Sequence, residues 1–388
     1  MMKKLISLLL AAIMLLGCLS ACAGKEKPTE DTANAASQQE NAPSGESAED
    51  AAAEEAEKTD DVSGEESVEE KTVTVTDDSG RELTISLPIE KLVVLDSSPF
   101  EILSAFGKLD LVLANIQATE GNPLYDALDG LPTVATHAEI NYELLAELQP
   151  QVVLSSVRAH GVVTDQEYLS GFDIKDVKLN LRVPETMRDG VRVMGQLFSC
   201  EDKAQEIVAF YDKWENFIAE RVGGLTDEQR VKVFLEYHAG SYKTGAPSSR
   251  FYSQVVLAGG INIAKDLTVG EEPEVSAEWV AEMNPDVIIK EVTGLGYRSE
   301  NADKAKDAYD ELISREGLSM TKAVQNKNVH VISSDIYSRP AYIVGVCYLA
   351  KWFYPDLFED FDPDTVLEEY FALFHPGKAV GGIWTYDE

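Results

Sequence analysis

Arginine, tyrosine, histidine and short polar side chains recur in this 388-residue chain where predicted strands end. An arginine offers a planar fork of N–H donors to carboxylate or hydroxamate oxygens, and a tyrosine offers an apolar face with a polar tip. The candidate ligand-binding residues are Asp96, Ser97, Arg158, His160, Tyr237, His238, Tyr242, Arg250, Tyr297, Arg298, Tyr337 and Arg339. Taken singly, each also fits a solvated loop. As a set, four arginines in an otherwise acidic chain favour an anionic ligand, with Arg339 beside Pro340 as the leading candidate and Arg158 next.

Direct coordination of a transition metal is not predicted, because such a site needs three or four convergent histidine, cysteine or carboxylate ligands. The five histidines are scattered along the chain, with His330 inside a predicted strand and His375 near the C-terminal tail. His160 or His238 can still serve as the axial ligand of a haem or a corrinoid, although a single loop histidine is more often an ordinary surface residue. We therefore expect no cofactor of the protein's own and a ligand that carries its own metal.

Several classes of function lack their sequence signals. The chain has no Gly-x-Ser-x-Gly elbow, no phosphate-binding glycine-rich loop, no His-Glu-x-x-His and no paired cysteine motif, so catalysis is not predicted. The formal net charge of −35 argues against a nucleic-acid partner, because a phosphate backbone requires clustered lysine and arginine. Cys200 and Cys347 lie far apart in apolar helical patterns, which favours buried free thiols over a disulfide.

The first 21 residues have the pattern of a signal peptide. Lys3 and Lys4 precede an apolar run that is too short to span a membrane. The run leads to Leu-Ser-Ala-Cys at residues 19–22, which resembles the bacterial lipoprotein box, where a peptidase cuts before a cysteine that becomes lipidated. This resemblance implies lipidation at Cys22. Cys18 is a second candidate with a bulky leucine where small residues are usual, and a secretory signal with an incidental cysteine is the alternative.

Residues 22–71 are expected to form a flexible acidic tether. Between 25 and 71 the chain has 16 acidic and 4 basic residues, and almost no aromatic or branched ones. Such a composition cannot bury a core, and its like charges extend the segment. No later apolar run reaches membrane-spanning length, so we expect the folded part to be tethered to a membrane and not embedded in it.

The folded part begins with a predicted β-hairpin, 72–76 and 83–87. A continuous apolar strand at 92–95 follows, then a polar turn and a helix at 100–106. This is a βα unit, and its turn lies where α/β folds bind ligands. Further strands are predicted at 111–113, 132–134, 152–154 and 177–181, with a helix at 141–148 that stops before Pro150.

Residues 199–222 are predicted to form one long helix. Apolar residues recur between Ile207 and Val222 at three- and four-residue steps. Ser199 with Asp202 indicates an approximate capping box, and Gly223 supplies a left-handed stop. A helix of this length spans roughly 30 Å, so we interpret it as a strut between two lobes, with a core helix inside one domain as the alternative.

The second half repeats the organisation of the first. Strands are predicted at 231–237, 287–290 and 329–332, and helices at 251–257, 341–353 and 362–374. In the first half Glu143 opens a short helix that ends at a proline before a buried strand, and Glu278 does the same in the second half. Two similar halves joined by one helix predict a bilobed α/β fold with a ligand cleft between facing strand ends.

With these features the sequence resembles the substrate-binding lipoproteins of ABC importers, in the class whose lobes are joined by a rigid helix and whose ligands are iron–siderophore complexes, haem and cobalamin. The resemblance runs from residue 73 to the C-terminus. It rests on the doubled Glu…Pro-Asp-Val-Ile pattern, with Gln151 in place of the first aspartate, and on the ending Ala-Lys-Trp-Phe-Tyr-Pro-Asp-Leu-Phe at 350–358. It implies two Rossmann-like lobes joined by one long rigid α-helix. It also implies that Glu143 and Glu278 dock on arginines of the permease, although each also fits an acid that complements a helix N-terminus.

The predicted organisation is a signal peptide at 1–21, a tether at 22–71, an N-terminal lobe at 72–182, linker helices at 183–225 and a C-terminal lobe at 226–388. The resemblance implies a lipid-anchored monomer on the outer face of the cytoplasmic membrane. Such a protein would deliver a metal chelate, in the first place an iron–siderophore complex, to the permease and ATPase of an importer. The rival interpretations are a tethered α/β enzyme that acts in the cleft and a sensor that reports its ligand to a membrane receptor. A rigid connector also predicts little closure of the lobes.

Overall fold

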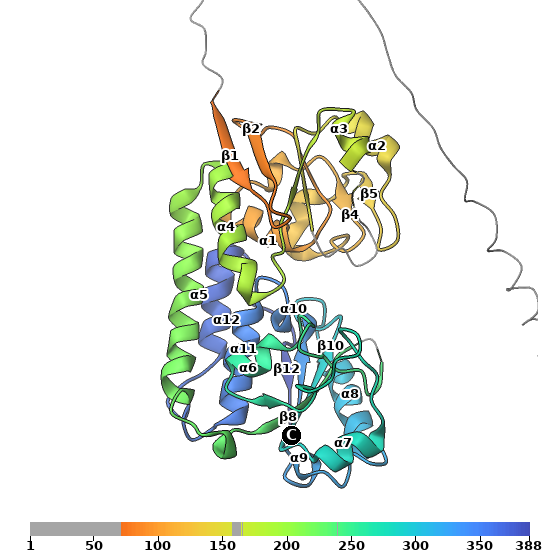
Figure 1. The fold of residues 1–388 in the computed structure, drawn as a ribbon, viewed down its shortest axis with the longest axis vertical. Helices are drawn as coiled ribbons and strands as arrows, with labels where there is room; N and C mark the ends of the chain where they lie inside the picture. Colours follow the sequence, from red (N-terminus) through yellow and green to blue (C-terminus); the bar gives the residue numbers. More distant parts are fainter. Residues whose placement is uncertain (1–70, 157–163, 165, 239) are drawn as a thin grey trace, which may run out of the picture. The chain divides into compact units, whose positions relative to one another are not determined.

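The structure is a computed structural model that describes residues 71–156, 164, 166–238 and 240–388. The predicted signal peptide, the candidate lipidation sites Cys18 and Cys22, and the tether up to residue 70 lie outside these residues, as do Arg158 and His160. The described residues belong to one compact unit, and Figure 1 labels many of its helices and strands. Among the residues described, no helix is long and apolar enough to cross a membrane.

Small sheets make up the first part of this unit. Its strands are β1 (Thr72–Thr76), β2 (Glu82–Ser86), β3 (Leu92–Val94), β4 (Asn115–Ile116), β5 (Thr133–Ala135), β6 (Val152–Ser155) and β7 (Lys175–Lys178). The helices between them are α1 (Ser98–Phe106), α2 (Tyr142–Leu148) and α3 (Gln166–Ser170), with the 3-10 turns η1 (Leu109–Leu111) and η2 (Pro123–Leu128). β1 and β2 form the predicted antiparallel hairpin, whereas β3-β6-β7 and β4-β5 are parallel.

Burial explains the strands β3 and β6, in which every residue is buried, as expected for continuous apolar runs in a parallel sheet. The predicted strand at 111–113 is wrong, because η1 occupies its start and Val112 makes only an isolated bridge to Leu92. The strand predicted at 177–181 begins earlier, at Lys175. It includes the buried Asp176, whose carboxylate accepts hydrogen bonds from the hydroxyls of Ser155 (2.6 Å) and Thr164 (2.7 Å).

Two helices lead to the second part of the unit, α4 (Pro184–Phe198) and α5 (Glu201–Val222). α5 confirms the predicted long helix and its end at Val222, but the predicted start at Ser199 and the left-handed conformation of Gly223 are wrong. Ser199 has φ 52° and closes α4, while Cys200 precedes α5 and makes no side-chain cap. Gly223 is right-handed, with φ −65°. The cause is α4, which lies within the predicted linker helices at 183–225 and packs on α5, so Ser199 must reverse the chain between two helices instead of starting one.

A five-stranded sheet forms the core of the second part. Its strands are β8 (Lys232–Glu236), β9 (Ile261–Asn262), β10 (Val287–Val292), β11 (Val329–Ser333) and β12 (Thr385–Tyr386), in the order β12-β11-β10-β8-β9. All neighbours are parallel except β12, which runs antiparallel to β11. The helical segments are η3 (Asp227–Gln229), α6 (Ser253–Leu257), α7 (Ala277–Met283), α8 (Asp303–Ser314), α9 (Lys322–Gln325), α10 (Ser334–Tyr337), α11 (Tyr342–Phe353) and α12 (Asp364–Phe374).

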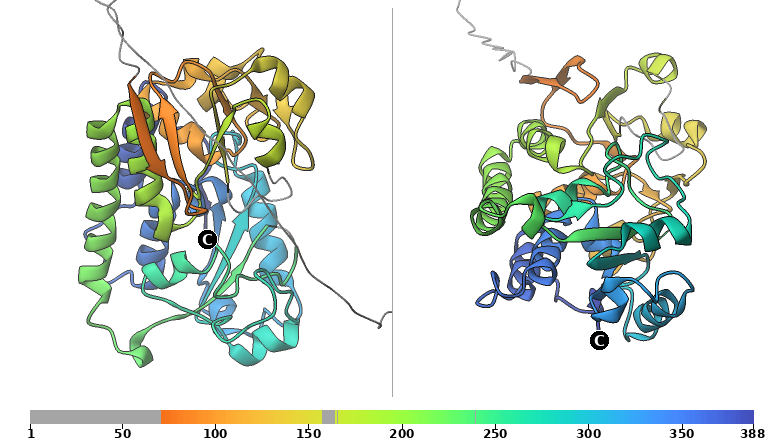
Figure 2. Two further views of the ribbon diagram at one scale, coloured as in Figure 1. Left: turned by 45° about the horizontal axis from the view of Figure 1, so that its top comes forward. Right: turned by 60° about the horizontal axis from the view of Figure 1, so that its bottom comes forward.

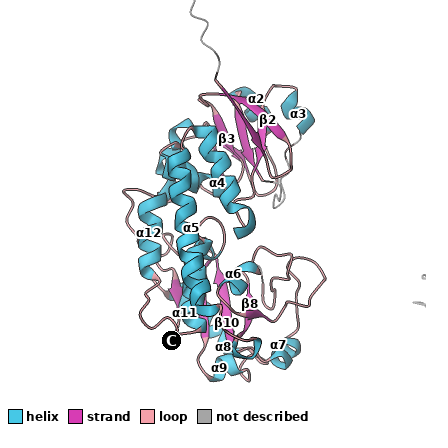
Figure 3. Cartoon of the chain, turned by 60° about the vertical axis from the view of Figure 1, so that its left-hand side comes forward, coloured by secondary structure: helices cyan, strands magenta, loops and turns pink. Residues whose placement is uncertain are grey.

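The last two helices return to the side of α5. Figures 1 and 2 show α4 and α5 (green) beside α11 and α12 (blue), and Figure 3 shows the same helices from another side. The ring of Tyr211 on α5 stacks on Tyr342 of α11 with centroids 5.4 Å apart, and its hydroxyl donates to the carbonyl of Pro340 at 2.8 Å. α12 also packs against α1. The connecting helix is therefore one member of a packed helical layer.

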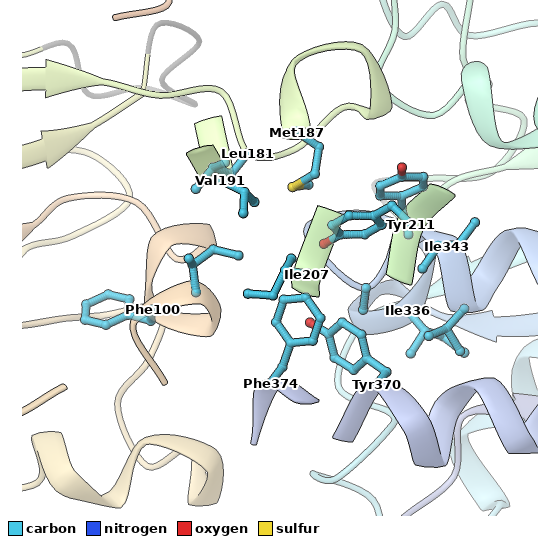
Figure 4. Packing of buried hydrophobic residues seen from close by; sticks show 14 of the residues in the cluster. Phe100, Leu181, Met187, Val191, Ile207, Tyr211, Ile336, Ile343, Tyr370 and Phe374 are labelled. Atoms are coloured by element: carbon cyan, nitrogen blue, oxygen red, sulfur yellow. The ribbon is translucent and has the colours of Figure 1, made fainter. Parts of the chain in front are cut away.

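One apolar core runs through this layer and into both sets of strands. Figure 4 shows Met187 of α4, Ile207 of α5 and Phe374 of α12 gathered in one part of this core, with Phe100 of α1 farther to the side, and all four are fully buried. The same cluster contains β3 and part of β8. Burial of apolar surface stabilises by roughly 25 cal/mol per Å². Moving one set of strands against the other would therefore expose surface that now holds the layer together.

The predicted internal repeat is present in the structure. Asn141 and Ser276 each accept a backbone N–H at the start of a seven-residue helix, α2 or α7. Gln149 and Asn284 end those helices in the left-handed conformation, with φ 45° and 47°. In each copy a proline and a buried strand follow, β6 or β10. The two copies of the repeat therefore share the same kind of N-cap and the same left-handed stop.

The two cysteines in the described part of the chain are free thiols, as predicted. Cys347 is buried in α11. Cys200 is only half-buried, which corrects the expectation of burial, because it lies in the short connection between α4 and α5.

Candidate ligand-binding cleft

A cavity of about 540 Å³ lies between the two sets of strands, at the carboxyl ends of the parallel sheets. Asp96 and Ser97 follow β3, Ser155 and Ser156 lie at the end of β6, and Glu291 belongs to β10. The charged and histidine side chains in its wall are Asp96, His137, Arg182, His238, Arg250, Glu291, Arg298, Asp335 and Arg339. The parallel topology therefore gathers at one place residues that are separated by more than 200 positions in the sequence.

Arg182 is the best-paired of the four cavity arginines. Its guanidinium donates to the carboxylate of Asp96 at 2.9 Å, and Asp96 also accepts the backbone N–H of Ser98 at 2.8 Å. Burial alone would raise the pKa of Asp96, but the charge of Arg182 and the bond from Ser98 lower it below its usual value. Asp96 therefore stays ionised and fixes Arg182 at the edge of the first sheet.

Arg250 has no carboxylate within ion-pair distance among the described residues. Its guanidinium lies over the ring of Phe251, 4.4 Å from the centroid, and its Nε atom is buried without a hydrogen-bond partner in that part of the chain. Burial and the nearby charge of Arg182 lower the pKa of Arg250. A partly buried cation of this kind would be stabilised by an anionic ligand.

Arg339 lines the cavity and lies close to two buried acids. Its Nη1 atom is 3.6 Å from a carboxylate oxygen of Asp335, and its backbone has φ 70°, a conformation that costs about 1–2 kcal/mol outside glycine. Glu101 of α1 accepts a hydrogen bond from Tyr370 of α12. Burial raises the pKa of Glu101 to about 7, against the opposing hydrogen bond from Tyr370 and charge of Arg339. Burial raises the pKa of Asp335 as well.

His238 and Glu291 form a pair on the wall made by the second sheet. One carboxylate oxygen of Glu291 contacts His238 Nδ1 at 2.6 Å and accepts its backbone N–H at 3.0 Å. The other oxygen of Glu291 is buried without a partner among the described residues, and so is one oxygen of Asp335. The cavity therefore offers acceptors as well as cations. Within the part of the chain that the structure describes, no group of three or more histidine, cysteine or acidic residues is arranged to hold a metal ion.

The predicted ligand-binding residues divide into three groups. Those that line the cavity are Asp96, Ser97, His238, Arg250, Arg298 and Arg339. The four predicted tyrosines do not line it: Tyr237 and Tyr337 pack around Phe251, Tyr242 packs against Arg315, and Tyr297 lies behind Arg298 with its hydroxyl bonded to Asn122. Arg158 and His160 lie outside the described residues. These tyrosines contribute to packing and not to the cavity wall, because their rings fill apolar space and their hydroxyls find polar partners inside the fold.

Three charged residues of the cavity were missed by the sequence reasoning. Arg182 follows the last strand of the first sheet, and Asp335 follows β11, so both carried the strand-end signal used for the others. Glu291 was missed because β10 runs two residues past the predicted end at 290, and Glu291 is the first of these two. No pattern in the sequence marks that residue as a cavity residue.

The chain matches the periplasmic binding protein family over residues 92–336, more than half its length, and it belongs to that family. Molybdate-binding protein MolA of Haemophilus influenzae is 24% identical over 335 residues, which cover 78% of this chain and 90% of MolA. The lipoprotein YvrC of Bacillus subtilis, named as an uncharacterized ABC transporter substrate-binding protein, is 26% identical over 296 residues, covering 74% and 87%. The crystal structure of FepB, a TroA-like periplasmic binding protein of Veillonella parvula, superposes with a TM-score of 0.70 at 22% identity and covers 81% of this chain and 99% of FepB.

These likenesses agree with the bilobed α/β fold and with a cleft between the lobes. The family consists of binding proteins and not of enzymes, so the tethered-enzyme interpretation is set aside. The chain is a substrate-binding protein of the type that serves ABC importers.

Proposed function

We propose that this protein binds an anionic metal chelate, with an iron–siderophore complex as the leading case, outside the cytoplasmic membrane and delivers it to an ABC permease and its ATPase. The observation that carries the proposal is Arg250, a half-buried arginine whose buried Nε atom has no hydrogen-bond partner and whose guanidinium has no carboxylate partner among the described residues. Arg298 strengthens it, since its guanidinium donates to the carbonyl of Ala118 at 3.2 Å and forms no ion pair with an acid in the described part of the chain. Two cations that form no ion pair with the described acids favour a ligand that supplies negative charge.

The size and polarity of the cavity support a chelate over a small ion. Ligand sites of roughly 300–1,000 Å³ hold molecules of drug size, and the cavity of about 540 Å³ lies within that range. Glu291 and Asp335 each have an oxygen available as a hydrogen-bond acceptor. A ligand with both anionic oxygens and N–H or O–H groups would satisfy the guanidinium groups and these acceptors together.

A tetrahedral oxyanion is the second candidate, and the relative MolA favours it, since MolA is named for molybdate and has been crystallised with it. Arginine forks suit such an anion. An oxyanion, however, has no donor for Glu291 or Asp335 unless those acids hold protons. Haem and corrinoids are also candidate ligands, because His238 lies in the cavity wall and can serve as an axial ligand to their metal.

The proposed location rests on the sequence at Cys22. Its lipoprotein box implies diacylation there, and the relative YvrC is named a lipoprotein. When cells grow with an alkyne-labelled fatty acid, the wild-type protein should become labelled and the Cys22→Ser variant should not. If labelling is instead lost when Cys18 is replaced, Cys18 is the lipidated residue. If the wild-type protein is not labelled at all, the lipid anchor is removed from the proposal.

The ligand is tested by calorimetric titration of the purified protein with ferric hydroxamate, ferric catecholate, ferric citrate, haemin, cyanocobalamin and sodium molybdate. We expect stoichiometric, unaltered uptake of one anionic ferric chelate with a sub-micromolar Kd. If molybdate is the one member of the panel that binds tightly, the metal chelate is refuted as the ligand and the oxyanion takes its place. A neutral ligand bound equally well by an Arg250→Met variant would overturn the anionic class.

A further inference from the structure

The C-terminal tail, residues 380–386, lies against the loop that carries Arg298 into the cavity. This loop, residues 293–299, is called the cleft strap here, because Thr293, Gly294 and Arg298 line the cavity. Gly296 in the strap and Ile383 in the tail exchange two backbone hydrogen bonds, of 2.5 and 3.2 Å. β12 follows at once and pairs with β11, so the tail is itself tied to the five-stranded sheet.

The contact between strap and tail is close enough to exclude side chains. A Cβ atom at Gly382 would lie 1.9 Å from the carbonyl oxygen of Gly296. A Cβ atom at Gly296 would lie 2.8 Å from the ring of Trp384. The Trp384 ring also packs on Tyr297, with centroids 5.9 Å apart, and is almost fully buried. Glycine at both positions thus permits an approach that any other residue would prevent.

The strap in turn contacts the first set of strands across the cavity. The amide of Asn122 donates to the hydroxyl of Tyr297 at 2.7 Å, and Arg298 donates to the carbonyl of Ala118 at 3.2 Å. The guanidinium of Arg298 also lies 5.5 Å from the centre of the Tyr297 ring. A continuous series of contacts therefore leads from the tail through the strap to the opposite wall.

We infer that the C-terminal tail positions Tyr297 and Arg298 across the mouth of the cleft and so controls how fast the ligand leaves. Arg298 is the strap residue that faces the ligand, while Gly382, Trp384 and Tyr297 act as positioning residues. The tail acts at a distance from the ligand, since it lines no part of the cavity. The part of this inference that concerns ligand release rests on the proposed function, whereas the coupling between the tail and the strap does not.

The coupling is tested without ligand by hydrogen–deuterium exchange on the full chain. Gly382→Ala should speed amide exchange at 294–299 and at 118–122, because the tail must move off Gly296. Gly381→Ala is the matched control, since a Cβ there meets nothing within 4 Å, and it should leave both segments unchanged. Tyr297→Phe should speed exchange at 118–122 and leave the tail protected. Unchanged strap exchange in Gly382→Ala, with the tail itself exposed, would overturn the inference.

Ligand release is measured by stopped-flow displacement of whichever ferric chelate the titration identifies. Gly382→Ala should raise koff by about tenfold, as for loss of one hydrogen bond to a charged group, with kon nearly constant. Arg298→Met should do the same, and the double variant should add little, because both changes remove one interaction. If Gly382→Ala fails to fold, Trp384→Leu provides the same comparison. Additive effects would refute action through Arg298, and exchange results that hold while no panel member binds would place the failure in the proposed function.

Discussion

Replacing Arg250 by methionine should separate ligand affinity from stability. The change keeps an unbranched apolar side chain over Phe251 and removes the charge. If the ligand's anionic group is the partner of this guanidinium, its loss costs about 2–4 kcal/mol, which weakens binding by about 30- to 1,000-fold. The free protein has no acid paired with Arg250 among the described residues, and burial already disfavours the charge. Its free energy of unfolding should therefore stay equal or rise.

The measurements are calorimetric titration and thermal unfolding of the ligand-free protein. Arg182→Met is the informative comparison, since it leaves the buried carboxylate of Asp96 without its cation and should lower stability by about 3–5 kcal/mol as well as affinity. Arg192→Met, at an exposed position on α4, should change neither. An unchanged Kd in Arg250→Met, or a loss of stability as large as in Arg182→Met, would refute the assignment of Arg250 as an unpaired anion site.

Three further predictions concern the charge network, docking and closure. Because burial raises the pKa of Glu101 to about 7, the native state holds a proton that the unfolded chain loses near pH 4.5; stability should fall by about 3 kcal/mol as pH rises from 4.5 to 7, and Glu101→Gln should flatten that part of the profile. Urea unfolding across this range checks it, and an equally steep profile in the variant contradicts it. Charge reversal of the exposed Glu143 and Glu278 to lysine should abolish uptake in cells but leave Kd unchanged, whereas reversal of Glu147 and Glu282, one turn further along the same helices, should leave uptake intact; normal uptake by the first pair would disprove docking there. Small-angle scattering should show nearly equal radii of gyration with and without ligand, because α5 packs within a continuous apolar core, and a marked compaction would show that the layer hinges.

Local patterns were enough for much of this protein. The apolar runs of β3, β6 and β10, the hairpin and the periodic face of α5 follow from side-chain spacing, so the bilobed α/β class and most element positions were predictable. The repeated cap, stop and proline of α2 and α7 were visible for the same reason. Charge and strand-end position identified Arg250, Arg298 and Arg339 as cavity residues.

Tertiary packing decided what local patterns leave open. Ser199 looks like a helix start, but the packing of α4 on α5 makes it a reversal between two helices. The predicted tyrosines are polar enough to bind ligand, yet in the fold their hydroxyls find internal partners, as Tyr337 does at the carbonyl of Phe251. The tail at 380–386 carries no recognisable motif, and only the sheet brings it to the strap. Spacing along the chain reports the period of one element, whereas contacts between elements depend on which surfaces meet in three dimensions.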